Sequence, residues 1–209
     1  MKKKTLLIVS SLIVAVALCA CGSPSPTETT DSFLQALKSE DSDAVKTLYA
    51  DDKINILEEF EENNTGDVES KAIAKLIEEE VKPKMLDFKY EISNEKIDGN
   101  KATVDVKLTT YDMGAAFTAF AGEYFTQAFT LAFSGTSEEE LNALAETLLS
   151  EKLTAAEKNY HQTVTVSLTQ KDDKWMIDKF EENGVFFNAI TGGIIDAVNG
   201  LNEAYNFDQ

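Results

Sequence analysis

The side chains in this sequence best suited to reactive chemistry near neutral pH are the thiols of Cys19 and Cys21 and the imidazole of His161. A thiol can carry a covalent group, and an imidazole can act as a general base. His161 follows Tyr160 at the start of a predicted strand, where a lone histidine is more often a surface or hydrogen-bonded residue. With one histidine and two cysteines, the residue count excludes a zinc site of thiolates or several imidazoles. No convincing catalytic triad or cysteine nucleophile with a base can be assembled.

Carboxylates are abundant, so a metal site with oxygen ligands has to be considered separately. Residues 61–67 superficially resemble a calcium-binding loop. Such a loop has aspartate at its first position and glutamate at its twelfth, whereas this segment has Glu61 and Ala72 there. The glutamates at 78–80 and 138–140 are consecutive, so in a helix they point in different directions. We therefore predict neither a metal nor a cofactor.

The segment that best fits a binding site is an aromatic stretch at residues 113–133, whose only charged residue is Glu123. Helical spacing makes it apolar nearly all round, which predicts a helix that is deeply buried or lines an apolar space. Core packing is one interpretation. In the other, an apolar pocket has Tyr111, Tyr124 or Gln127 to orient a lipid or small amphipathic ligand. The candidate pocket residues are Phe117, Phe120, Tyr124 and Phe125.

The N-terminus has the three-part layout of a secretory signal peptide. Lysines at 2–4 precede an apolar run at 6–18, and small residues follow before Cys21. The apolar run is short for a membrane-spanning helix. An ordinary signal peptide cut elsewhere and an uncleaved anchor helix are the alternatives.

The sequence Leu18-Cys19-Ala20-Cys21 resembles the lipobox of bacterial lipoproteins. The resemblance implies cleavage after Ala20, which makes residues 1–20 the signal peptide, and transfer of a diacylglyceryl group to the Cys21 thiol. Its two acyl chains, of the palmitate type, would hold the protein at the cell membrane on the extracytoplasmic face, since one chain gives only marginal attachment.

The composition limits the classes of partner. The chain has 19 basic and 37 acidic residues, and every basic residue is lysine. Loss of the three signal lysines leaves a formal charge of about −21. Such a surface repels phosphate backbones and anionic lipid, and it has no arginine for bidentate phosphate recognition, so nucleic-acid binding is excluded. The mature chain also has no thiol for a disulfide if Cys21 carries a lipid.

We predict a flexible tether at 21–30 and one α+β domain at 31–209. Residues 22–30 contain two prolines and no large apolar side chain, and would reach roughly 28 Å when extended. Helical spacing then follows, with Asp31 and Asp41 as N-caps. A further helix is expected around residues 56–60, and another at 73–82 that ends at Pro83 and carries a Glu78–Lys82 pair.

The apolar period then changes to two residues and predicts two β-hairpins. The first spans residues 88–108 and turns at Asp98-Gly99, and the second spans 164–177 and turns at Asp172-Asp173. Two helices are inserted between the hairpins, the second with a capping box of Ser137 and Glu140. A last helix at 187–204 has one long apolar face. The expected fold is a curved antiparallel sheet of about four strands packed with N-terminal helices.

The segments at 31–38, 41–49 and 164–178, together with the lipobox, resemble uncharacterised bacterial lipoproteins with a nuclear-transport-factor-two or cystatin-like fold. In that fold a curved sheet forms a cone whose mouth often binds small molecules. The insertion at 111–159 and the helix after Phe186 depart from it and either fill or roof the cone. The resemblance assigns no functional residue.

The leading hypothesis is a non-enzymatic, lipid-anchored binding or accessory lipoprotein of the cell envelope whose partner is an envelope protein or a small apolar ligand. One alternative is a carrier of an apolar molecule or lipid. Another is an envelope enzyme with His161 or a buried carboxylate as general base. A third is an assembly role in which the apolar face at 187–201 pairs with another chain.

Overall fold

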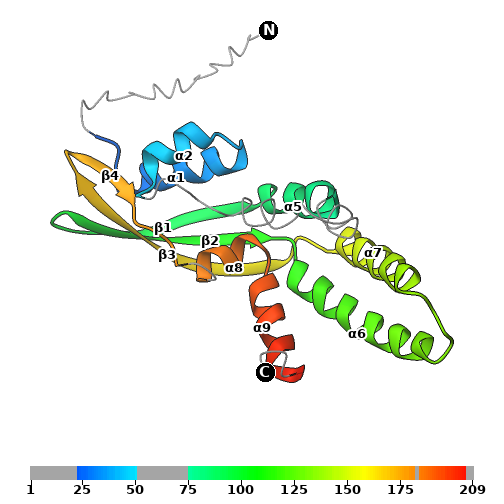
Figure 1. The fold of residues 1–209 in the computed structure, drawn as a ribbon. Coiled ribbons are helices and arrows are strands. Elements are labelled where there is room, and N and C mark those ends of the chain that lie inside the picture. The colour runs from blue at the N-terminus through cyan, green and yellow to red at the C-terminus, as the bar shows by residue number, and fades with distance from the viewer. Residues whose placement is uncertain (1–22, 51–74, 182–183, 206–209) are drawn as a thin grey trace, which may run out of the picture.

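The computed structural model describes residues 23–50, 75–181 and 184–205. The signal peptide, Cys21, the helix expected at 56–60 and the calcium-like residues at 61–72 lie outside these ranges. Within them the chain is a mixed α+β domain with a four-stranded antiparallel sheet, which confirms the predicted fold class (Figure 1).

The first helix begins earlier than the sequence interpretation placed it. Helix α1 spans Pro26–Lys38, and Ser25 and Glu28 form its capping box. Thr29 and Thr30 are buried, so residues 26–30 belong to the domain and not to a flexible tether. The N-cap is therefore Ser25 and not Asp31, whereas Asp41 caps helix α2 (Ser42–Leu48) as predicted.

The helix expected at 73–82 does not end at Pro83 but continues through it to Leu86. A π-helical turn, η1 (Ile77–Val81), continues into α5 (Lys82–Leu86), with Pro83 in the first turn of α5, where its missing N–H is tolerated. The predicted Glu78–Lys82 pair is present, at 3.2 Å between Oε1 and Nζ.

The sheet is an antiparallel meander in the order β1 (Lys89–Asp98), β2 (Lys101–Thr110), β3 (Tyr160–Lys171) and β4 (Lys174–Ile177). Alternate residues of β2 from Ala102 to Thr110 are buried on one face. Helices α1 and α8 (Val185–Ile190) cover this face, and their rings Phe33 and Phe186 lie 6.2 Å apart. Both predicted hairpins are present, because alternation and turn residues specify them locally. The second turns at Asp172-Asp173 as predicted, whereas the first turns one residue later than predicted, at Gly99-Asn100, with Asp98 paired to Lys101.

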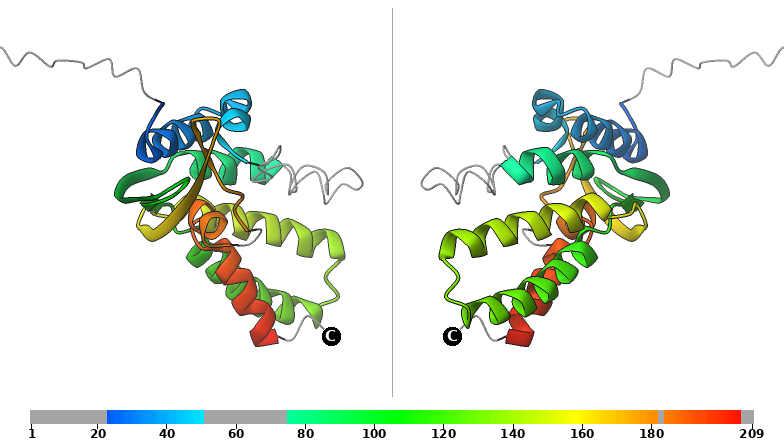
Figure 2. Two further views of the ribbon diagram at one scale, coloured as in Figure 1. Left: turned by 90° about the vertical axis from the view of Figure 1, so that its left-hand side faces the viewer. Right: turned by 90° about the vertical axis from the view of Figure 1, so that its right-hand side faces the viewer.

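The insertion between β2 and β3 is a pair of antiparallel helices, α6 (Met113–Ala132) and α7 (Glu138–Ala155). Ser137 and Glu140 form the expected capping box of α7. Figures 1 and 2 show that this helical hairpin reaches away from the sheet, with its tip far from the other elements. Only its base packs against the main core.

The C-terminal segment forms two helices, where one was expected. Helix α8 ends at Ile190, and α9 (Ile194–Tyr205) begins after Gly192 and Gly193, which have φ angles of 60° and 85°. These left-handed conformations stop a right-handed helix and redirect the chain. Helix α9 then packs along α6 (Figure 2).

A cluster at the base of the insertion ties it to the sheet. The Asp87 carboxylate lies 2.5 Å from Lys158 Nζ and accepts a hydrogen bond from the Tyr111 hydroxyl at 3.1 Å. Lys158 also lies over the Tyr111 ring, 4.8 Å from its centroid. The hydrogen bond from Lys158, opposed by partial desolvation, lowers the pKa of Asp87.

This lowered pKa predicts a pH-dependent contribution to stability. A carboxylate whose folded pKa lies below its unfolded value stabilises the fold above the unfolded pKa, and the contribution disappears as the pH falls through the folded pKa. Asp87→Asn is expected to lower the free energy of unfolding at pH 7 by less than about 1 kcal/mol, since the side chain is 58% exposed. In urea titrations the difference from the wild type should shrink below about pH 4. A difference independent of pH would contradict this role.

Candidate functional site

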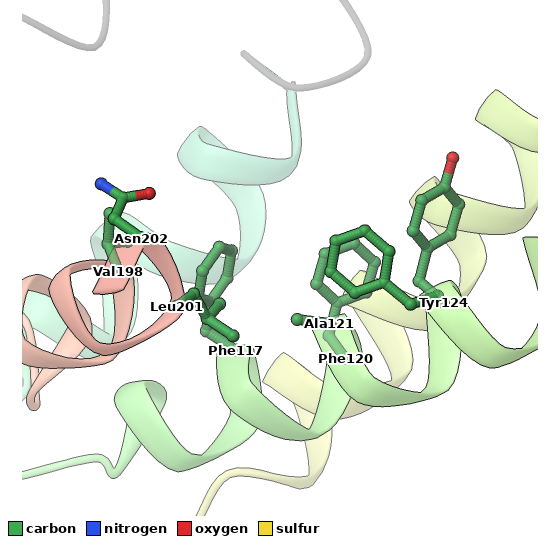
Figure 3. Close-up of a pocket in the computed structure, with 8 residues that line it drawn as sticks. Phe117, Phe120, Ala121, Tyr124, Val198, Leu201 and Asn202 are labelled. Atoms are coloured by element: carbon green, nitrogen blue, oxygen red, sulfur yellow. The ribbon is translucent and has the colours of Figure 1, made fainter. Parts of the chain in front are cut away.

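An apolar groove of about 280 Å³ lies between α6 and α9. Helix α6 supplies aromatic rings, and α9 supplies two aliphatic side chains and one amide. In Figure 3 Phe117 meets Leu201 across the groove, and the Tyr124 hydroxyl points away from α9. The lining residues are Phe117, Phe120, Ala121, Tyr124, Phe125, Val198, Leu201 and Asn202.

The structure brings together all four candidate pocket residues predicted from the sequence: Phe117, Phe120, Tyr124 and Phe125. Their rings contact one another in series, with centroids 5.7 to 6.1 Å apart. The contribution of α9 was missed. Its apolar face was visible in the sequence, but pairing with α6 depends on the turn at Gly192 and Gly193.

The aromatic helix was expected to be deeply buried or to line an apolar space, and it lines one; its buried positions are confined to its first half. Met113 and Ala121 are buried, whereas Phe125, Phe129 and Phe133 are 41%, 69% and 79% exposed. These three phenylalanines recur every four residues and lie on one side of α6. Phe125 lines the groove, and Phe129 and Phe133 continue the exposed apolar surface from it toward the tip of the hairpin.

A polar network centred on the buried Asn188 fixes the start of α9. Asn188 donates hydrogen bonds to the Tyr160 hydroxyl at 3.0 Å and to Asp196 at 2.7 Å, and its oxygen accepts from the Asp196 N–H at 3.0 Å. Burial raises the pKa of Tyr160. Side chains on β3, α8 and α9 are thereby joined, so the α9 wall of the groove is held in place without a ligand.

The backbone adds a second constraint at the same turn. The Gly114 N–H at the start of α6 donates to the Gly192 carbonyl at 2.8 Å. A Cβ at Gly192 would overlap the Tyr111 carbonyl oxygen. The chain segments that lead into α6 and α9 are in direct contact because neither glycine has a side chain.

Two of the three side chains expected to orient a ligand lie elsewhere. The Tyr111 hydroxyl donates to Asp87, and the Gln127 amide donates to Glu123 at 3.1 Å on its own helix. Of the three, Tyr124 lines the groove, where Asn202 provides the other polar side chain.

His161 lies on the exposed outer face of the sheet. Its Nδ1 is 3.0 Å from Thr109 Oγ1 on the neighbouring strand. A second hollow of about 270 Å³, at the bases of α6 and α7, contains Asp112, Glu157 and Lys152. Asp112 caps α6, and Lys152 pairs with Glu123 at 2.6 Å. His161 therefore lies in neither hollow. The second hollow does contain carboxylates, but Asp112 is a helix cap that is only half-buried and Glu157 is exposed, so neither is the buried carboxylate of the enzyme alternative.

Within residues 23–50, 75–181 and 184–205, no three histidine, cysteine, aspartate or glutamate side chains are grouped as they would be around a metal ion. In the same part of the chain, no helix combines the length and the apolar character needed to cross a membrane.

Comparisons with protein-family models, with curated proteins and with solved structures found no match for this chain.

Proposed function

We propose that this protein is a non-enzymatic binding lipoprotein, held by lipid on Cys21 at the extracytoplasmic face of the cell membrane, which binds an apolar surface in the α6–α9 groove. The observation that carries the binding proposal is the exposed aromatic surface of α6 beside that groove. Phe129 and Phe133 are 69% and 79% exposed in a chain with a formal charge of −18. Exposed apolar patches of this kind mark sites of interaction.

The groove favours part of a protein partner over an enclosed small molecule. A drug-sized ligand is usually surrounded by a pocket of roughly 300–1,000 Å³. This groove of about 280 Å³ lies at the lower end of that range and is open to solvent, and exposed aromatic side chains continue along α6 beyond its end. A carrier of an apolar molecule or lipid is the second candidate, supported by the almost wholly apolar lining.

The lipid anchor would act by raising the local concentration of the domain near a membrane partner. Three residues separate Cys21 from the N-cap Ser25, so the extended link spans at most roughly 14 Å. This is about half of the reach expected from the sequence. The domain would therefore work close to the membrane surface. Membership of the cystatin-like lipoproteins, which the sequence resembles, is likewise part of this proposal.

The binding proposal is tested with Nile red, an uncharged dye whose fluorescence rises in apolar sites. We expect the full chain to enhance the dye's fluorescence and Leu201→Asp to weaken dye affinity about tenfold, because a carboxylate would then face the apolar lining. Phe125→Ser, at a more exposed position, should weaken it severalfold without loss of the fold.

The matched control is Ile97→Asp, which places the same carboxylate at a side chain that is 55% exposed on β1 and remote from the groove. It should leave dye affinity unchanged. Equal affinity in the wild type and both folded groove variants would overturn the proposed site. Circular dichroism and thermal melting verify that each variant is folded.

A further inference from the structure

We infer that strand β1 pairs with β1 of a second copy of this chain, antiparallel and centred on Tyr90. Within the described residues β1 is an outer strand of the sheet, and its one neighbouring strand is β2. An outer edge of this kind offers N–H and C=O groups to another strand. The inference goes beyond the proposed function, because it concerns a different part of the domain and does not depend on the groove.

The hydrogen bonds of the sheet show which residues of β1 point outward. The Gln170 N–H donates to the Asn100 carbonyl at 2.8 Å, so Asn100 directs its carbonyl toward β3. The direction alternates along an antiparallel strand, so the odd-numbered residues of β2 face β1. Their partners on β1, up to the register shift after Ser93, are also odd-numbered. The even-numbered residues Tyr90 and Ile92 therefore direct their N–H and C=O groups to the open edge.

Phe88, directly before β1, has the same direction. Its carbonyl accepts a hydrogen bond from Lys38 Nζ at 2.7 Å, which independently places this group on the open side. A carbonyl oxygen has two lone pairs, so a partner strand can bind it beside Lys38. In the described part of the chain, the outward backbone groups of Tyr90 and Ile92 have no partner. The open edge thus has three outward residues, at 88, 90 and 92.

The register of the pairing follows from the length of this edge. After Ser93 the pairing of β1 with β2 shifts at a bulge, which ends the straight part of the strand. Three outward residues with Tyr90 at the centre match an identical antiparallel set when Tyr90 meets Tyr90 and Phe88 meets Ile92. This register pairs every outward residue, whereas any displaced register leaves at least one unpaired.

Charge favours the same register. On the outer face of the sheet it places Lys89 opposite Glu91 of the second copy, and Glu91 opposite Lys89 of the second copy. Opposite charges at directly opposed positions stabilise a pair of strands, and like charges destabilise it. A register centred on residue 89 or 91 would instead oppose two lysines or two glutamates. The charges of β1 are therefore complementary to β1 itself.

The charge of the chain is also balanced at this edge. The whole chain has a formal charge of −18, whereas β1 and β2 together carry four lysines and four carboxylates. Pairing would cover Tyr90 and Ile92, which are only half-buried, while the β2 residues opposite them are fully buried. The eight charged residues are Lys89, Glu91, Glu95, Lys96, Asp98, Lys101, Asp105 and Lys107.

The pairing agrees with attachment of both copies to one membrane. The two-fold axis between antiparallel strands is perpendicular to the sheet, so α1 of each copy lies on the same face of the joined sheet. The Thr27 N–H donates to the Glu95 carboxylate at 2.9 Å, so α1 begins beside β1. The links to the two lipidated cysteines would therefore leave from one face, and anchoring would raise the local concentration of both copies.

Sedimentation equilibrium of the purified full chain, in detergent that matches the density of the solvent, measures the dimer. A strand edge is a small interface, so we expect reversible dimerisation with a Kd of about 10–100 μM. Lys89→Glu and Glu91→Lys should each weaken it about tenfold, because like charges are then opposed twice across the axis. The double variant Lys89→Glu/Glu91→Lys should regain the wild-type affinity to within about threefold. Lys174→Glu, the same change on the outer strand β4, should leave it unchanged.

Proline substitutions test the backbone contact. Ile92→Pro removes an N–H that the sheet does not use, so the fold should tolerate it while dimerisation is lost. Ile97→Pro is the matched control. Ile97 opposes Ala102, an even-numbered residue of β2, so it also points outward, but it lies beyond the paired segment. It should leave the dimer unchanged. Circular dichroism verifies each fold, and the charge variants decide the matter if Ile92→Pro does not fold.

The outcomes are distinct from those of the groove. A wild type that is monomeric throughout this concentration range would overturn the second copy as the occupant of the edge. A dimer that none of the β1 changes weakens would be formed by another surface and would overturn the inference equally. Loss of the dimer in both single charge variants without recovery in the double variant would overturn the register. None of these results changes the expected binding of Nile red.

Discussion

Gly192→Ala is expected to lower the free energy of unfolding by about 2–4 kcal/mol and to disturb the α6–α9 groove. A left-handed conformation costs alanine about 1–2 kcal/mol, and Gly192 has a φ of 60°. The new Cβ would also overlap the Tyr111 carbonyl oxygen, so backbone has to move, at a cost typical of overpacking. Urea unfolding measures the first effect, and Nile red affinity at a temperature where the variant is folded measures the second.

Two other glycines provide matched controls for this prediction. Gly135, in the α6–α7 turn, has a φ of 75° but open space where a Cβ would stand, so Gly135→Ala should cost only about 1 kcal/mol. Gly200 lies within α9 and also has open space, so Gly200→Ala should stabilise the protein by about 0.5–1 kcal/mol. A Gly192→Ala variant no less stable than Gly135→Ala would show that the close contact with Tyr111 is not a constraint.

The hairpins and most helix starts could be predicted because their signals are local. Alternating apolar residues and the turn signal around Gly99 specify β1 and β2 without information from the rest of the chain, although the turn lies at Gly99-Asn100 and not at the predicted Asp98-Gly99. The early start of α1 was equally visible in the sequence. Ser25 and Glu28 form a capping box, with Pro26 in the first helical position. The prolines were interpreted as part of a tether, although proline is favoured at that position.

The aromatic half of the groove could be predicted, and its other half could not. Periodicity identifies α6 as apolar, but whether Phe129 is buried depends on what packs beside it. Helices α7 and α9 pack against α6, and no periodicity within α6 reports where that packing ends. The pairing of α6 with α9 depends in turn on the positive φ angles at Gly192 and Gly193, which change the direction of the chain.

Cys21→Ser is expected to abolish lipid attachment completely. The change removes one sulfur atom, and serine is too weak a nucleophile to take its place in forming the thioether of a lipoprotein. Cells grown with labelled palmitate should incorporate label into the wild-type protein and none into Cys21→Ser. The mature wild type should begin at residue 21 by mass, with two or more acyl chains that retain it in the membrane fraction until detergent is added.

Cys19→Ser is the matched control, because it removes the other thiol, two residues away and on the signal-peptide side of the expected cut. It should carry the lipid label and have the same mature mass as the wild type. Each remaining interpretation of the N-terminus gives a different mass. An ordinary signal peptide would leave an unlabelled chain beginning elsewhere, and an uncleaved anchor helix would leave the full 209 residues without lipid. Either mass in the wild type would refute the anchor at Cys21 and, with it, the short link that places the groove near the membrane.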